Sequence, residues 1–182
     1  RFDYDYWAYA PSLVKTIYAT NSSVRRLVSN RSYDNLVRLT NINSVINGSV
    51  GSQFEYQYND ANQRTVRTDL GGSYWVYQYD ELGQVTSGKR YWSDGTPVSG
   101  QQYEYAFDDI GNRKHTMEGG NEYGTSLRYS GYTVNDQNQI TSRTVPPYVN
   151  VLGTATNNAT VTVNNQPTYR KGDYWHRELS VD

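Results

Sequence analysis

The stretch YQYDELGQVTS, residues 77–87, joins an alternating run of tyrosines to an aspartate and, three positions later, a glycine. Closely similar stretches stand at YQYNDANQRTV (56–66) and YAFDDIGNRKH (105–115). Large and polar residues alternate on both sides of the Asp…Gly pair, and a period of two residues predicts β-strands rather than a helix. A unit that returns along the chain predicts a repeat architecture.

Five copies of the unit align on one template: an aromatic residue, Asp or Asn, two variable residues, then Gly or Asn. They are YDNLV (33–37), YNDAN (58–62), YDELG (79–83), FDDIG (107–111) and VNDQN (134–138). The steps between copies vary in length while the core of the unit is constant. We therefore expect a constant hairpin corner with variable loops between the corners.

The residue types of the template predict the geometry of the corner. Asp or Asn opens a type I turn, because its side chain accepts a hydrogen bond from the backbone two residues later. The fifth residue then needs a positive φ, which Gly adopts freely and Asn more readily than other residues. This geometry is a type I turn followed by a Gly-type bulge. Val37 breaks the rule, so the first corner is predicted to be strained or differently built.

The flanks of the corners read as strands, and we find no convincing helix. The stretch PSLVKTIYA (11–19) has partly helical spacing, but its β-branched residues favour a strand.

The sequence resembles the YD-repeat, or RHS-repeat, family, whose signature is Tyr-Asp-x-x-Gly-Arg-Leu followed by a polar strand. The stretches YDNLVRLT (33–40), YDELGQVT (79–86) and FDDIGNRK (107–114) carry the resemblance best. It covers about residues 24–145 and departs from the family pattern at Val37, Ala61 and Val134. The resemblance implies a spiralling β-shell in which many repeats wind around a hollow. The aspartyl self-cleavage signature of some members is not visible.

The predicted fold class is all-β: consecutive antiparallel hairpins in a curling repeat sheet, a partial RHS-type β-shell, with a small C-terminal β unit. The expected divisions are an N-terminal β segment (1–23), the hairpin repeats (24–145) and the C-terminal β unit (146–182), which follows two adjacent prolines. We expect the chain to be a fragment of a larger repeat protein. We also expect the C-terminal unit to fold back over the last edge of the sheet through Tyr169, Tyr174 and Trp175.

Composition excludes several classes of function. The net charge is −1 and no basic stripe is present, so nucleic-acid binding lacks its electrostatic basis. Cysteine is absent, which removes disulfides and thiolate metal sites. No apolar run approaches the roughly 18 residues of a membrane-spanning helix.

No catalytic residue, metal ligand or cofactor site is predicted. Asp108 and Asp109 have the residue types of an acid/base pair or a calcium site, but the corner already requires an acid at the first of them. His115 and His176 are the only histidines and lie far apart in sequence, which disfavours a His-based metal site or triad. The stretch EGGNEYG (118–124) lacks the Lys-Ser/Thr pair of a phosphate loop and reads as an ordinary loop.

The residues considered for sugar binding are Trp92, Trp75, Tyr91 and Tyr74. Aromatic rings exposed on a sheet stack on sugar rings, although core or strand packing is the commoner role of such residues. Trp92 is the favoured platform because it stands at a strand end beside a predicted loop, SDGTP (93–97).

The predicted function is structural: a repeat segment of a secreted or surface-displayed scaffold, bacterial in origin, that encloses or presents another polypeptide. Five copies are too few to enclose anything alone, so the expected partners are neighbouring repeats of a longer parent chain or an enclosed polypeptide. The resemblance implies cell-surface, toxin-delivery or adhesion settings. Two alternatives stay open: a carbohydrate-binding module that binds polysaccharide, and a glycoside hydrolase of unrecognised type that uses two carboxylates about 5–9 Å apart.

Overall fold

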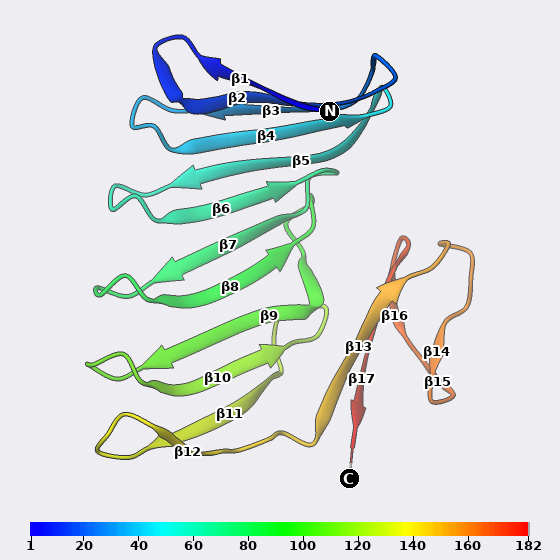
Figure 1. The fold of residues 1–182 in the computed structure, drawn as a ribbon. Helices are drawn as coiled ribbons and strands as arrows, with labels where there is room; N and C mark the ends of the chain where they lie inside the picture. Colours follow the sequence, from blue (N-terminus) through cyan, green and yellow to red (C-terminus); the bar gives the residue numbers. More distant parts are fainter. Residues whose placement is uncertain (182) are drawn as a thin grey trace. The chain divides into compact units, whose positions relative to one another are not determined.

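The computed structural model describes residues 1–181, and over this range the chain forms strands and turns without a helix (Figure 1). The all-β prediction is confirmed. The stretch at 11–19 lies within β2 (Ala10–Asn21), as its β-branched residues favoured.

Twelve strands of the described chain form one antiparallel sheet in which every strand pairs with its neighbours in sequence, so the sheet is a series of hairpins. The order in the sheet is the order along the chain, and the sheet does not close on itself. Its strands are β1 (Phe2–Trp7), β2 (Ala10–Asn21), β3 (Val24–Tyr33), β4 (Leu39–Ile46), β5 (Ser49–Tyr58), β6 (Arg64–Asp69), β7 (Tyr74–Tyr79), β8 (Val85–Tyr91), β9 (Pro97–Phe107), β10 (Arg113–Gly119), β11 (Leu127–Val134) and β12 (Ile140–Arg143).

The segment after the two prolines forms small sheets of its own. A three-stranded sheet has the order β13-β17-β16, and β14 pairs with β15. The bounds are β13 (Tyr148–Thr154), β14 (Thr162–Val163), β15 (Gln166–Pro167), β16 (Tyr169–Lys171) and β17 (Tyr174–Ser180).

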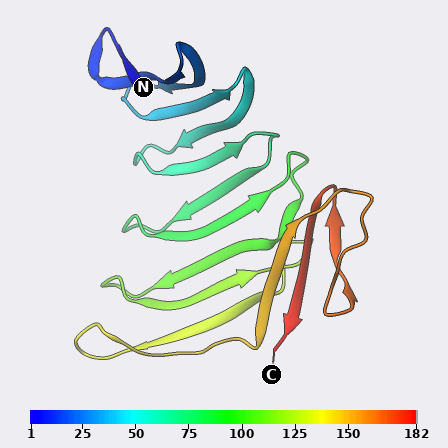
Figure 2. The same cartoon turned by 45° about the vertical axis from the view of Figure 1, so that its right-hand side comes forward.

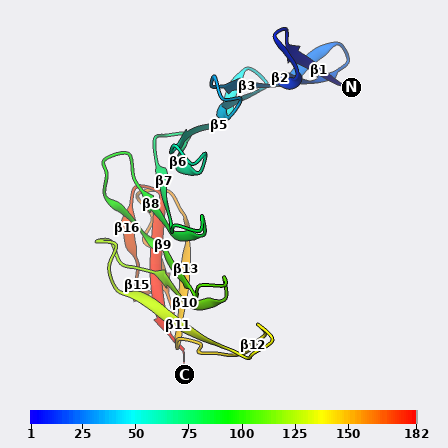
Figure 3. The same ribbon diagram turned by 90° about the vertical axis from the view of Figure 1, so that its left-hand side faces the viewer.

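The chain divides into two compact units, Arg1–Trp75 and Val76–Asp182, and β7 contains the boundary between them. In the second unit, the corners of the β7/β8, β9/β10 and β11/β12 hairpins lie along one side (Figure 3). The division predicted from sequence at residues 24 and 146 stays a prediction.

The pairing register shifts beside the repeat corners, as the predicted bulges require. The shifts fall between Ser32 and Tyr33, between Gln57 and Tyr58, and between Thr133 and Val134. Another separates Arg113 from His115. Each bulge adds a residue beside the turn and increases the local twist of the strand.

Burial in the second unit is greatest where β13 and β17 cross β9 (Figure 2). Val98 is fully buried, and Ser99 and Gln102 are each 1% exposed. The Gln102 amide donates hydrogen bonds to the carbonyls of Arg90 (2.8 Å) and Val98 (3.0 Å), which compensates for its removal from water.

The C-terminal strands are placed differently from the expectation. Instead of covering the last edge of the sheet, β13 and β17 contact β9, and β12 remains the terminal strand of the sheet. Tyr174 does supply docking area, since it is 8% exposed. The physical reason is the polar and aromatic complementarity with β9 described below, which the edge strand β12, exposed along its whole length, does not offer.

No helix in the described part of the chain is long and apolar enough to span a membrane.

Candidate functional site: the hairpin corners

The fifth residue of each repeat corner has the positive φ that the sequence predicts. Gly83 and Gly111 have φ of 81° and 90°, and Asn62 and Asn138 both have φ of 61°. The corner prediction is therefore confirmed at all four positions.

Val37 adopts the same backbone conformation, with φ of 66°. The first corner is thus built like the others and is strained, because a β-branched residue is poorly tolerated at positive φ. The repeat geometry therefore imposes a positive φ on Val37, although valine disfavours that conformation.

Each corner is closed by the same backbone bonds. In the first, the Asp34 N–H donates to the carbonyl of Arg38 (3.0 Å), and the Val37 N–H donates to the carbonyl of Asp34 (3.0 Å). The equivalent pair of bonds is present in the corners that begin at Asn59, Asp80, Asp108 and Asn135.

The Asp or Asn side chain completes the closure. Oδ1 of Asp108 accepts hydrogen bonds from the N–H groups of Ile110 (3.1 Å) and Asn112 (2.7 Å). Asp34 and Asp80 accept the same two bonds in their own corners. The turn interpretation of Asp108 is confirmed.

The pKa values of two corner aspartates reflect these bonds. A hydrogen bond from the Asn112 side chain, supported by backbone N–H groups, lowers the pKa of Asp108 below its ordinary value despite some desolvation. Desolvation raises the pKa of Asp34, but hydrogen bonds from the Arg38 backbone and side chain outweigh it, so this pKa is also lowered. Both carboxylates are therefore ionised acceptors.

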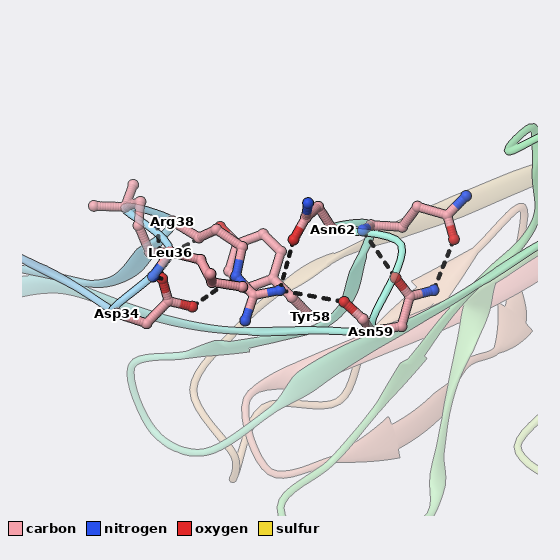
Figure 4. A network of polar contacts seen from close by, with 8 residues as sticks. Asp34, Leu36, Arg38, Tyr58, Asn59 and Asn62 are labelled. Atoms are coloured by element: carbon pink, nitrogen blue, oxygen red, sulfur yellow. Dashed lines mark hydrogen bonds and ion pairs between the residues drawn. The ribbon is translucent and has the colours of Figure 1, made fainter.

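Arg38, the residue after the fifth position, links the first corner to the second (Figure 4). Arg38 pairs with Asp34 in its own corner (Nε–Oδ2 2.6 Å). Its guanidinium also donates to the Asn59 carbonyl (3.2 Å) and to Asn62 Oδ1 (3.0 Å) of the second corner. The same guanidinium lies 4.9 Å from the ring centre of Tyr58, the aromatic residue that begins the second copy.

A second link of this kind joins the fourth and fifth corners. The Asn112 amide donates to Asp108 Oδ2 (2.9 Å) and to Asn138 Oδ1 (3.1 Å). Sequence analysis missed this role. The available signal is that the sixth position always carries a guanidinium or an amide: Arg38, Gln63, Gln84, Asn112 and Gln139.

The second and sixth positions are chemically matched. Where the second residue is Asp34 or Asp108, the sixth is Arg or Asn, and it donates to the carboxylate. Where the second residue is Asn59 or Asn135, the sixth is Gln, which accepts a hydrogen bond from the Asn amide (2.7 and 3.0 Å).

Corners of the same type also occur between the repeat copies. Gly72, Gly95 and Gly124 have positive φ and occupy the fifth position of turns that sequence analysis did not recognise as corners, although it expected loops at 93–97 and 118–124. Their second-position residues are Asp69, Trp92 and Asn121, respectively. The Asp69 and Asn121 turns lack the aromatic first residue of the template, since Thr68 and Gly120 precede them, and the Trp92 turn lacks Asp or Asn at its second position.

The residues considered for sugar binding fall in two pairs. Tyr74 and Trp75 begin β7, and Tyr91 ends β8 with Trp92 directly after it. The first pair belongs to one compact unit and the second pair to the other. Trp92 is part of a corner and makes an edge-on contact with Tyr174, with ring centres 5.5 Å apart. The Lys171 ammonium lies 5.7 Å from the Trp92 ring centre.

Charged groups fasten the C-terminal strands to the β8–β11 region. Lys171 pairs with Asp94 (2.6 Å), and the Arg128 Nε–H donates to Glu178 Oε1 (2.8 Å). The hydrogen bond from Lys171 lowers the pKa of Asp94. The Tyr174 hydroxyl donates to the Ser99 carbonyl (2.6 Å), and burial raises the pKa of Tyr174.

Residues 1–181, which the structure describes, contain no cluster of three or more side chains that could hold a metal ion. His115 stacks on Tyr129, with ring centres 5.2 Å apart, whereas His176 lies on β17 against β9.

No protein-family model matches the chain. No curated protein sequence matches it either.

Solved structures do match. The crystal structure of TcdB2-TccC3-Cdc42 is similar to the chain with a TM-score of 0.63 and 14% sequence identity, over 98% of this chain and 8% of that one. The crystal structure of TcdB2-TccC3-TEV is similar with a TM-score of 0.60 and the same identity and coverage. The chain therefore spans about 8% of the length of these structures, and at this identity the similarity shows the fold alone.

Proposed function

We propose that this chain is a structural segment of a YD-repeat, or RHS-type, scaffold that encloses or presents another polypeptide, secreted from or displayed on a bacterial cell. The observation that carries the proposal is the bonding between successive corners. Arg38 joins the first corner to the second, and Asn112 joins the fourth to the fifth. Two of the five corners are thus bonded to the corner that follows, and such contacts between neighbouring units are how repeat proteins extend.

The fold comparison supports the proposal at a coarse level. Nearly all of this chain matches a small part of two far longer chains.

The open sheet also supports an assembly role. Both terminal strands, β1 and β12, pair on one side only within the described sheet. Strand edges of this kind pair with further strands, so neighbouring repeats of a longer parent chain are the partners that fit them.

The test is to recover the natural product with antibodies against this chain, measure its intact mass and subject it to limited proteolysis. The proposal expects a much longer chain together with a polypeptide that resists protease until the scaffold is unfolded. A natural product of 182 residues, with no protected polypeptide, would contradict it.

A further inference from the structure

Side chains from three strands form a continuous hydrogen-bonded series where β13 and β17 contact β9. Ser99 on β9 lies 2.6 Å (Oγ–Nδ1) from His176 on β17, and the other ring nitrogen of His176 lies 2.9 Å (Nε2–Oδ1) from Asn150 on β13. Ser99 is 1% exposed and His176 is 6% exposed. A hydroxyl, an imidazole and an orienting amide in this order are the components of an activated nucleophile.

The hydrogen bonds fix the proton positions. Asn150 Oδ1 can only accept, so the His176 Nε2 carries a proton and its Nδ1 presents a lone pair to Ser99. The Ser99 hydroxyl has one other acceptor, the carbonyl of Gly120, at the longer distance of 3.3 Å. The hydroxyl proton is therefore directed at the base.

The protonation state of His176 agrees with this arrangement. Burial lowers its pKa below the ordinary value, and Arg177 acts in the same direction, while Glu178 and Glu122 act against it. The imidazole is neutral near pH 7 and able to accept a proton.

Two glycines, Gly100 and Gly119, provide the space that the His176 and Asn150 side chains occupy. A Cβ on Gly100 would lie 2.6 Å from His176 Cδ2, and a Cβ on Gly119 would lie 2.8 Å from Asn150 Nδ2. Both glycines have positive φ, so the backbone conformation and the close approach require the same residue type. The stretch 118–124, which reads as an ordinary loop in sequence, thus lies beside Ser99, His176 and Asn150.

A cavity of about 330 Å³ opens on Ser99 and His176. Its volume is that of a site for a small molecule. The wall is polar and carries both signs of charge, from Arg128 and Arg177 on one hand and Glu122 and Glu178 on the other. Because Ser99 is almost fully buried, only a short acyl group can reach its hydroxyl, while the polar wall suits a hydroxylated alcohol portion.

We propose that Ser99, His176 and Asn150 form a nucleophilic site that hydrolyses esters of a short acyl group with a polar alcohol. Ser99 and His176 act as the catalytic residues, and Asn150 acts as a positioning residue. The inference is independent of the scaffold role.

The reaction has two balanced steps. The Ser99 Oγ bonds to the ester carbonyl carbon while its proton passes to His176 Nδ1; the carbon–oxygen bond to the alcohol breaks, and the alcohol leaves with that proton. Water then adds to the acyl-serine and gives its proton to Nδ1. The acid leaves as the Ser99–acyl bond breaks, and the proton returns to Ser99.

The first test uses the intact chain and a fluorophosphonate with a short alkyl group, followed by peptide mass spectrometry. The proposal expects one adduct, on Ser99, and at least about a 10²-fold slower adduct formation in His176→Gln. Ser87→Ala is the matched control, because Ser87 is 4% exposed on β8 and bonds Gln78 outside the cavity; it labels like the wild type. A folded wild-type chain that forms no adduct on Ser99 would overturn the proposal, whether or not the variants fold.

The second test measures hydrolysis of 4-nitrophenyl acetate. Ser99→Ala should abolish turnover, and circular dichroism confirms that the variant is folded. Asn150→Ala should lower kcat with little change in KM, and Asn150→Asp should restore part of kcat, since a carboxylate also accepts a hydrogen bond from the His176 Nε2–H. Equal turnover by the wild type and Ser99→Ala would show that the three residues only fasten β13 and β17 to β9.

Discussion

Val37 is the residue at which local preference and repeat geometry disagree. Its φ of 66° matches the glycine and asparagine positions of the other corners, yet its side chain is β-branched. The backbone strain persists because the turn bonds and the ion pair of Asp34 with Arg38 hold the corner closed.

Val37→Gly should therefore raise the free energy of unfolding by about 1 kcal/mol, the relief of strain less the entropy that glycine adds to the unfolded chain. Gly83→Val should have the opposite sign and cost about 1–2 kcal/mol. Urea denaturation measures both. Val24→Gly is the control, because Val24 lies in a strand outside the positive-φ set and should lose stability on the same change. A destabilised Val37→Gly would show that the corner is not strained.

Trp92 carries the carbohydrate hypothesis, which stays a prediction. Because its ring packs edge-on against Tyr174, Trp92→Ala should lower the Tm by about 2–4 °C, the equivalent of about 1 kcal/mol. Retention on polysaccharide columns tests the hypothesis itself. A sugar site requires that the wild type is retained and Trp92→Ala is not, and a wild type that elutes unretarded from all columns would exclude it.

At the scale of the element, the docking of β13 and β17 on β9 depends on a neutral buried histidine. Burial lowers the pKa of His176 in the folded chain, so the unfolded chain binds more protons as the pH falls below about 6.5. The associated stability is fully present above that value and is lost as the pH falls through the lowered pKa. Arg177 favours the neutral form, whereas Glu178 and Glu122 oppose it.

Melting temperatures between pH 8 and pH 4.5 check this expectation, with a decline that begins near pH 6.5. His115→Gln should keep the decline, because His115, the only other histidine, contacts Tyr129 and takes no part in the bonds of His176 with Ser99 and Asn150. His176→Gln should remove it. If the His115 variant lost the decline and the His176 variant kept it, the assignment would be wrong.

The elements that sequence predicts well are those governed by neighbours in the chain. A corner needs Asp or Asn and a positive-φ residue within five positions, so Asp80 and Gly83 identify their turn directly. Ser99 and His176 are 77 positions apart, and no local sequence pattern indicates that they contact each other. The turn at Trp92 was predicted only as a loop, because Trp92 stands where the corner rule requires Asp or Asn.

At the scale of the whole molecule, removal of the C-terminal strands should expose the best-buried surface of the second unit. A chain that ends at Thr144 lacks β13 to β17 and loses the contacts of His176 and Tyr174 with Ser99, which is 1% exposed on β9. We expect it to aggregate at micromolar concentration, measured by light scattering against the full chain. A truncated chain that stays monomeric and equally heat-stable would show that residues 145–182 are an independent domain.

If neighbouring hairpin corners stabilise one another, the loss of the Arg38 side chain should loosen two corners at once, and hydrogen exchange on Arg38→Met measures this. Arg38 bonds Asp34 in its own corner and Asn59 and Asn62 in the next. Arg26→Met is the control, because the exposed Arg26 side chain lies outside the repeat corners. We expect Arg38→Met to speed amide exchange in both corners, at 34–38 and at 59–63, and Arg26→Met to change exchange in neither corner. Faster exchange confined to 34–38 would contradict it.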